Sequence, residues 1–347
     1  MRPFTSINDP IESQPTFVPL KVEAFLKSLI RDHRDLPFVY LLIRLTVMML
    51  PLAVLLFAKM EEWQWWILAI VYFVINNLVF KGPFGLMLHC TSHRKLFKKK
   101  YALLNHYIVW VIGPFFGQTP GTYYSHHIGM HHVENNLKND LSSTMMYQRD
   151  SLKEFSRYFV QFFFLGVIST AKYFMKNRQN RLRNKILLGE VIFYIFCMVL
   201  YFLNPAATVV VFIIPFFLSR IFMILGNWTQ HSFIDANDPA NHYKNSITCI
   251  NTRYNKKCWN DGYHTNHHLM PGKHFTEYPI IFQRDILKFA NNQALVFENI
   301  EYLGVWWCLM RRDYGKLSKH LVNINEEFNS TNEAIEIMKE RTKKIMD

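Results

Sequence analysis

Residues 127–132 read His-Ile-Gly-Met-His-His, and two related clusters stand at 89–93 (His-Cys-Thr-Ser-His) and 264–268 (His-Thr-Asn-His-His). Side chains three or four positions apart on a helix project from one face, so each cluster offers several imidazole nitrogens to one site. A weaker element, Asn-Trp-Thr-Gln-His, occupies 227–231. These four places hold nine of the 15 histidines. A single zinc ion takes only three or four ligands, so this set predicts two metal ions.

Long apolar segments flank the histidine clusters. Four of them are long enough to cross a bilayer core, which takes about 20 helical residues. They are Phe38–Ala58, Trp63–Leu88, Ile186–Leu203 and Thr208–Leu225. A short loop joins the first segment to the second, and another joins the third to the fourth. We therefore expect an all-α integral membrane protein with four transmembrane helices in two hairpins and a cytosolic, histidine-rich helical cap.

The positive charge of the chain predicts its orientation. Lys and Arg number 39 against 26 Asp and Glu, which gives a net charge of +13. Basic runs follow the second span, at 94–100, and precede the third, at 172–185. By the positive-inside rule these runs are cytosolic, and so are all the histidine clusters and both termini. The charge is also suited to anionic lipid, and without a nucleic-acid-binding motif we expect no nucleic-acid partner.

Two shorter apolar segments complicate the count of spans. Tyr158–Ala171 contains Gln161, and Tyr101–Phe116 is interrupted by Asn105, His106 and Gly113-Pro114. If Tyr158–Ala171 crossed the membrane, the clusters at 127–132 and 264–268 would lie on opposite faces. Both segments are therefore predicted to be interfacial or re-entrant.

Three regions follow from this pattern. Residues 1–36 form a cytosolic N-terminal region with a disordered tail, Met1–Pro19, and an amphipathic helix, Lys21–Arg34. Residues 37–275 form the membrane domain with the metal site, and 276–347 form a cytosolic helical segment. The last helix is predicted to start at Ser330, with Glu333 completing a capping box. The five cysteines contain no C-x-x-C pair, so they indicate no disulfide framework.

The residue types narrow the choice of metal. Imidazole binds Zn, Cu, Fe and Ni, and neither a cysteine pair nor a regular carboxylate pattern accompanies the clusters. The His-Glu-x-x-His motif of zinc metalloproteases is absent from the sequence. Nine imidazoles divided between two ions leave room for water or oxygen on each, which favours a di-iron centre. A zinc membrane hydrolase and a non-catalytic metal-binding membrane protein stay as alternatives.

The ordered set H-x3-H, H-x3-HH and H-x2-HH, placed around the predicted spans, resembles the membrane fatty acid desaturase and hydroxylase superfamily. Asn-Trp-x-x-His at 227–231 is similar to an additional ligand segment of acyl desaturases. The resemblance covers roughly residues 38–275. The second cluster departs from it, because three residues separate His127 from His131 where two are commoner. His264 stands where front-end desaturases carry Gln, which argues against that subgroup.

The resemblance implies two non-haem irons, O2 as co-substrate and a fatty acyl lipid as substrate. The implied ligands are His89, His93, His127, His131, His132, Asn227 (directly or through water), His231, His264, His267 and His268. Hydroxylation or ketolation of a lipid, sterol or carotenoid is the alternative reaction. No haem-binding His-Pro-Gly-Gly, ferredoxin cysteine pattern or G-x-G-x-x-G occurs, which implies a separate electron donor of cytochrome b5 or ferredoxin type. Endoplasmic reticulum and bacterial inner membrane both fit.

Two acidic residues beside the clusters are candidates to orient the imidazoles. Asp140 follows the second cluster, and Asp261 precedes the third. Metal-bound histidine usually donates its second ring N–H to a carboxylate, a carbonyl or water. The isolated histidines are expected to be structural; they are His33, His106, His242, His274 and His320.

Overall fold

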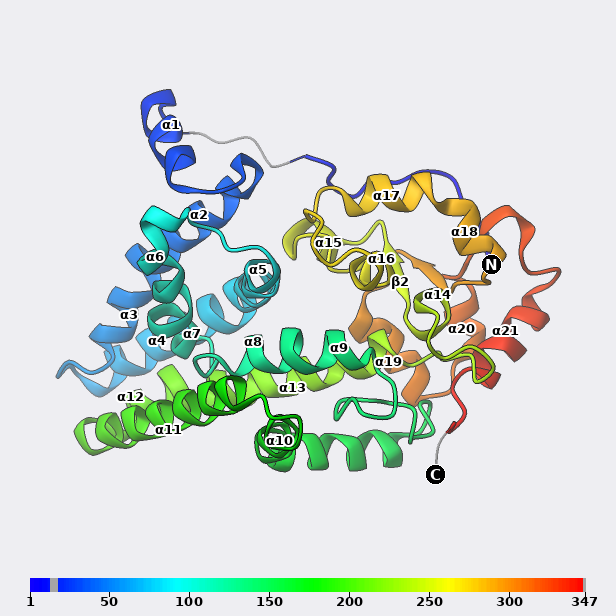
Figure 1. The fold of residues 1–347 in the computed structure, drawn as a ribbon. Helices are drawn as coiled ribbons and strands as arrows, with labels where there is room; N and C mark the ends of the chain where they lie inside the picture. Colours follow the sequence, from blue (N-terminus) through cyan, green and yellow to red (C-terminus); the bar gives the residue numbers. More distant parts are fainter. Residues whose placement is uncertain (13–17, 346–347) are drawn as a thin grey trace. The chain divides into compact units, whose positions relative to one another are not determined.

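The computed structural model describes residues 1–12 and 18–345, and these are mostly helical (Figure 1). The strands form two small parallel pairs, β1 (Arg2–Pro3) with β4 (Val322–Asn323) and β2 (Thr248–Ile250) with β3 (Val296–Glu298). The chain divides into two compact units. The first unit comprises Met1–Ile11, His127–Thr170 and Ile221–Asp347, and the second comprises Glu12–His126 and Ala171–Arg220.

The second unit contains most of the apolar helices. Its elements are α1 (Leu20–Leu29), η1 (His33–Asp35), α2 (Leu36–Arg44), η2 (Leu45–Met49), α3 (Leu50–Leu55), α4 (Glu62–Phe73), η3 (Val74–Phe80), α5 (Lys81–His93), η4 (Lys99–Tyr101), α6 (Ala102–Tyr107), η5 (Ile108–Ile112), α7 (Gly113–Phe115), α8 (Thr122–His126), α11 (Asn180–Leu203), α12 (Pro205–Thr208) and η7 (Val209–Ile213). Helices α10 (Leu152–Lys176) and α13 (Ile214–Gln230) each cross the division between the units.

By length and composition, five helices among the described residues could cross a membrane. They are His33–Leu55, Glu62–His93, Leu152–Lys176, Asn180–Leu203 and Pro205–Gln230. Four of them contain or overlap the predicted spans. The fifth, α10, contains the segment predicted to be interfacial, and its mean hydropathy of 1.2 is the lowest of the five. An integral membrane protein is thus supported.

Buried polar groups join the apolar helices of the second unit. Lys81 Nζ donates to the carbonyl oxygens of Phe116 and Pro215, both at 3.1 Å, and to Ser219 Oγ at 3.3 Å. On α11, Glu190 is 4% exposed and forms an ion pair with Arg220 at 3.0 Å. Polar groups inside a membrane have to be satisfied within the protein, which these contacts achieve.

The turn before α8 is held between α11 and α13. Gly117 has φ +75°, and a Cβ there would lie 2.3 Å from the backbone of Phe216 on α13. A Cβ at Gly189 on α11 would lie 1.7 Å from Pro120 O. Only glycine allows these close approaches. The turn therefore has a fixed position, and α8 leads directly from it into the second histidine cluster.

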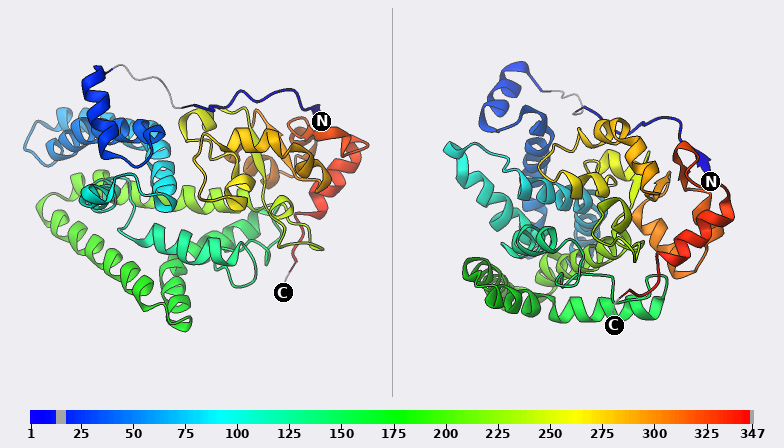
Figure 2. Two further views of the ribbon diagram at one scale, coloured as in Figure 1. Left: turned by 45° about the horizontal axis from the view of Figure 1, so that its top comes forward. Right: turned by 45° about the vertical axis from the view of Figure 1, so that its right-hand side comes forward.

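The first unit packs many short elements around its own apolar core. They are η6 (His127–His131), α9 (His132–Glu134), α14 (His242–Asn245), α15 (Arg253–Lys257), α16 (His264–Leu269), α17 (Tyr278–Arg284), α18 (Ile286–Asn291), α19 (Tyr302–Met310), α20 (Tyr314–Ser318), η8 (Ile324–Glu326) and α21 (Thr331–Glu340). Helices α20 and α21 pack side by side (Figure 2). The apolar core of the first unit includes Phe233, Phe297, Leu317 and Met338.

The prediction of a disordered tail is wrong for residues 1–12; residues 13–17 lie outside the described part of the chain. β1 pairs with β4, and Asp9 is buried at 4% exposure. The carboxylate of Asp9 accepts hydrogen bonds from Tyr263 Oη at 2.8 Å, Asn251 N at 2.6 Å and Asn255 Nδ2 at 3.0 Å. A buried carboxylate is stable when it has such donors, and all three come from distant sequence that local composition does not reveal.

Two helix predictions hold with changed details. The helix predicted at 21–34 ends at Leu29, because Ile30 forms a β-bridge with Phe97. Ser330 caps α21 by accepting from Glu333 N at 3.1 Å. The carboxylate of Glu333 binds Asn329 N at 2.8 Å, one residue before the cap.

Candidate metal centre

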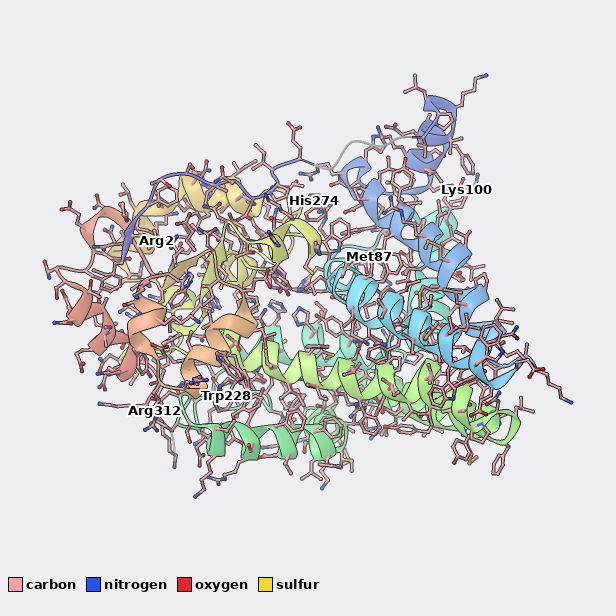
Figure 3. All side chains as sticks on the ribbon, turned by 180° about the vertical axis from the view of Figure 1, so that it is seen from behind. Arg2, Met87, Lys100, Trp228, His274 and Arg312 are labelled. Carbon is pink, nitrogen blue, oxygen red and sulfur yellow. The ribbon has the colours of Figure 1, made fainter. Side chains whose placement is uncertain are left out.

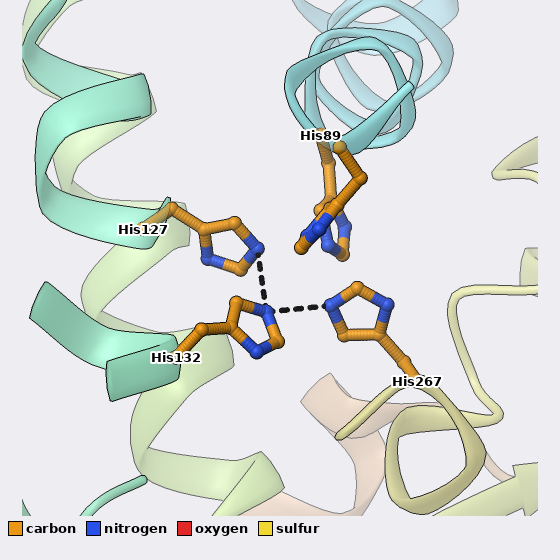
Figure 4. A group of neighbouring side chains, drawn as sticks. His89, His127, His132 and His267 are labelled. Atoms are coloured by element: carbon orange, nitrogen blue, oxygen red, sulfur yellow. Dashed lines mark hydrogen bonds between the residues drawn. The ribbon is translucent and has the colours of Figure 1, made fainter. Parts of the chain in front are cut away.

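Seven of the nine predicted histidine ligands lie in the first unit and form two groups. The first group consists of His127, His132 and His267. His132 Nε2 lies 3.1 Å from His127 Nε2 and 2.9 Å from His267 Nε2 (Figure 4). Imidazole nitrogens from residues more than 130 positions apart in the sequence therefore lie close together.

The second group consists of His131, His231, His264 and His268. All four side chains are buried, and their ligand nitrogens lie within 4.8 Å of one another. His264 Nε2 is 3.1 Å from His231 Nε2 and 3.0 Å from His268 Nε2. Imidazole nitrogens bind a divalent metal at about 2.1 Å, so two ligands at right angles around one ion lie about 3 Å apart. The spacing of the nitrogens thus fits one transition-metal ion.

A π-helical turn divides the second cluster between the groups. The segment His127–His131 is π-helical, with hydrogen bonds to the fifth residue rather than the fourth. This wider turn brings His127 and His132, five positions apart, to one group, while His131 joins the other group. Three residues separate His127 from His131, where two are commoner in acyl desaturases. The π-helical turn accommodates the additional residue.

Hydrogen bonds to the Nδ1 atoms orient several of the imidazoles. His131 Nδ1 lies 2.7 Å from Asp140 Oδ2, and His231 Nδ1 lies 2.8 Å from Asn245 O. His267 Nδ1 lies 3.2 Å from Tyr278 Oη. With Nδ1 engaged, Nε2 faces the centre of each group, as second partners of metal-bound histidine normally arrange it.

The Asp140 carboxylate is itself held firmly. It accepts from Asn136 N at 2.9 Å, Ser142 N at 2.8 Å and Ser142 Oγ at 2.6 Å. The prediction that Asp140 orients an imidazole is confirmed. Asp261 accepts from Tyr254 Oη at 2.7 Å and Gln230 Nε2 at 3.4 Å.

Burial keeps two members of the second group, His231 and His268, neutral. Desolvation, with a smaller effect from His131, lowers the pKa of His231 to about 4. Desolvation, followed by the neighbouring His264, lowers the pKa of His268 well below its ordinary value. Neutral imidazole is the form that binds a metal ion, so these sites are ready as ligands at neutral pH.

Asn227 is committed to a hydrogen-bond network beside the second group. Its Nδ2 donates to Ser142 O and to Tyr158 Oη, both at 2.8 Å. Tyr158 Oη also donates to Ser142 O at 3.1 Å. Sequence reasoning did not find Ser142, Tyr158, Asn245 or Tyr278 as supporting residues, because their roles depend on tertiary contacts and their spacing carries no motif.

The two remaining predicted ligands lie in the second unit. His89 and His93 are four positions apart on α5, with ring centroids 5.5 Å from each other. His89 is buried and His93 is half-buried. The helix therefore presents both imidazoles on one face, as their spacing predicts.

Apolar helices combined with two groups of clustered imidazoles characterise a membrane protein with candidate transition-metal sites. A family model described as fatty acid desaturase matches residues 63–298, which is more than half of the chain and includes every predicted ligand. The chain belongs to the fatty acid desaturase family. No match was found among curated proteins or among solved structures.

Proposed function

We propose that this protein is an integral membrane desaturase that uses two non-haem irons and O2 to introduce a double bond into a fatty acyl chain. The observation that carries the proposal is the convergence of seven imidazoles in two groups, with neighbouring nitrogens 2.9–3.1 Å apart. Membership of the fatty acid desaturase family supports it.

We assign the ligands as four and five. His131, His231, His264 and His268 would hold one iron. His127, His132 and His267 would hold the other, together with His89 and His93 from α5. Asn227, whose amide nitrogen is engaged by Ser142 and Tyr158, would act on the centre through water.

An unactivated methylene has no acidic proton and no electrophilic carbon, so acid–base catalysis cannot act on it. The irons would supply O2 activation and abstraction of hydrogen from the methylene. Burial holds His231 and His268 neutral. Contacts with Asp140, Asn245 and Tyr278 fix the orientation of three of the imidazoles. Apolar helices provide a water-poor path for the acyl chain. Electrons would come from a separate donor of cytochrome b5 or ferredoxin type.

The first histidine group supports a surface position for α10. His132 precedes α10 and His267 follows α13, and three candidate spans lie between these residues. Three crossings would separate two residues whose nitrogens are 2.9 Å apart, so one of the helices does not cross. Helix α10 has the lowest hydropathy and is the best candidate to lie along the surface. Four spans then remain, with the histidines on one side of the membrane, and the basic runs at 94–100 and 172–185 favour the cytosolic side.

Metal analysis and lipid profiling test the proposal together. The purified full-length chain should contain about two irons, and cells that express it should gain an unsaturated acyl product. His131→Ala and His267→Ala should stay in the membrane yet lose iron and product. His320→Ala is the control, because His320 Nδ1 binds Glu298 O at 2.9 Å, away from both groups.

Other outcomes would replace the proposal. A hydroxylated or ketonic product would identify the alternative reaction of the same superfamily. One tightly bound zinc with no oxidised lipid would indicate a hydrolase or a non-catalytic metal-binding protein.

A further inference from the structure

A row of aromatic side chains runs through the first unit. The ring of Tyr158 lies 5.0 Å from that of Trp228, and Trp228 lies 5.4 Å from Phe155. Phe155 lies 5.1 Å from Trp306, whose ring is 6.4 Å from Trp307. All these distances join ring centroids. The row connects α10, α13 and α19 by uninterrupted ring contacts.

The inner end of the row adjoins the candidate metal centre. Trp228 is fully buried near the end of α13 (Figure 3), three residues before His231. Tyr158 Oη donates to Ser142 O at 3.1 Å, and Ser142 Oγ donates to Asp140 at 2.6 Å. Asp140 in turn holds His131 at 2.7 Å. A few bonded and hydrogen-bonded steps therefore link the inner rings to two predicted ligands.

The outer end of the row reaches the protein surface. Trp307 is 52% exposed, whereas Trp228 is 0% exposed. The guanidinium of Arg311 lies 5.6 Å from the Trp307 ring. The last ring is therefore accessible at the protein surface, and the first is not.

Packing alone does not account for the indole at 306. Trp306 Nε1 is buried and has no hydrogen-bond partner among the described residues. A buried indole N–H usually has a partner, and leaving it without one costs stability. Phenylalanine would fill much of the same space without that cost. The indole brings a different property, since tryptophan loses one electron far more readily than phenylalanine.

We propose that Trp228, Trp306 and Trp307 form a relay that carries one-electron oxidising equivalents from the metal centre to the surface when no acyl chain is bound. This inference rests on the proposed function, because the oxidant is the O2-activated metal centre. Such a relay protects the histidine ligands from oxidation.

Electrons move along the relay in single steps. Trp228 would give one electron to the oxidised metal centre and take one from Trp306 across Phe155. Trp306 would then take one electron from Trp307. A thiol in solution returns an electron to Trp307 and releases its proton to water. Each indole keeps its N–H proton. Two such events convert two thiols into one disulfide and deliver two electrons to the metal centre.

Trp306→Phe tests the relay, and Trp259→Phe is the matched control. The Trp259 ring packs on Phe275 at 5.5 Å, outside the row. Trp306→Phe should unfold at a temperature no lower than the unchanged protein, so a loss of relay is not a loss of fold. Both variants and the unchanged protein are compared in two experiments.

The first experiment needs no iron. Azide radicals oxidise exposed indoles of the metal-free full-length chain, and peptide mass spectrometry locates the stable products. In the unchanged protein and in Trp259→Phe, oxidation should reach the buried Trp228. In Trp306→Phe, modification of Trp228 should fall several-fold. Equal modification of Trp228 in all three proteins overturns the relay.

The second experiment uses the reduced, iron-loaded chain with O2, without acyl lipid and with or without glutathione. The unchanged protein should show a tryptophan radical by electron paramagnetic resonance and oxidation at Trp307, which glutathione suppresses. Trp306→Phe should instead accumulate oxidation at Trp228 and His131. An unchanged oxidation map in Trp306→Phe overturns the relay.

Product formation from acyl lipid is measured in parallel. If no product forms but oxidation still moves along the tryptophans in the unchanged protein, the proposed desaturation is overturned and the relay is retained. Normal product with no effect of Trp306→Phe on either oxidation map overturns the relay alone.

Discussion

His132 Nε2 lies 2.9 Å from His267 Nε2, although 135 positions separate the two residues in the chain. Three helices long enough to span a membrane lie between them. A contact this short requires an even number of crossings along the intervening chain. The histidine pair therefore constrains membrane topology more strongly than the hydropathy of α10 does.

The resulting topology can be tested by labelling single introduced cysteines. Position 60, in the loop between α3 and α4, and position 206, in α12, should react from the outer or lumenal side. Positions 98 and 181 should react from the cytosolic side. Two spans precede position 98, and no span separates it from position 181 if α10 lies along the membrane surface. A membrane-impermeant maleimide applied to intact and permeabilised cells provides the measurement. If positions 98 and 181 react from opposite sides, α10 crosses the membrane.

The clustering of the candidate ligands could be predicted from sequence because helical spacing alone brings imidazoles to one face. The division of the second cluster between two groups could not, since it depends on the π-helical turn at His127–His131. The contacts of Asp9 could not be predicted from sequence either, because its three hydrogen-bond donors lie more than 240 positions away. Local patterns predict helices and their faces, whereas buried polar contacts between distant segments depend on the complete fold.

Asp140→Asn should weaken metal binding without unfolding the chain. The carboxylate accepts from the ring of His131 and fixes its orientation. Loss of such a partner typically costs 10–100-fold, roughly, in metal affinity. Competition with a chelator of known affinity measures the effect. Asp238→Asn is the control, because the Asp238 side chain is 47% exposed. Equal chelator sensitivity of both variants would remove Asp140 from the metal centre.

Glu190→Gln should strongly destabilise the second unit. Glu190 pairs with Arg220 at 3.0 Å and also accepts from Thr119, in the turn before α8, and from Thr122, the first residue of α8. Breaking a buried pair leaves an uncompensated charge, at a cost of about 3–5 kcal/mol. Glu154→Gln is the matched control; its partner Arg157 is 67% exposed, so about 0.2–1 kcal/mol is expected. Unfolding curves in detergent measure both variants. Similar shifts for the two would contradict a structural role for the buried pair.

Gly85→Leu should shift acyl selectivity toward shorter chains. Gly85 lies on α5 one turn before His89, and a Cβ built there meets no atom within 4 Å. The leucine side chain can therefore enter the free space beside the helix without displacing its neighbours, and it would shorten an acyl path that passes there. Gly272→Leu is the matched control, since its Cβ position is equally open but lies after the third histidine cluster, outside the candidate spans. Product profiles from mixed acyl substrates, with iron content measured on the same samples, provide the readout. Unchanged chain-length selectivity in an iron-loaded Gly85→Leu protein would show that the acyl path lies along another helix face.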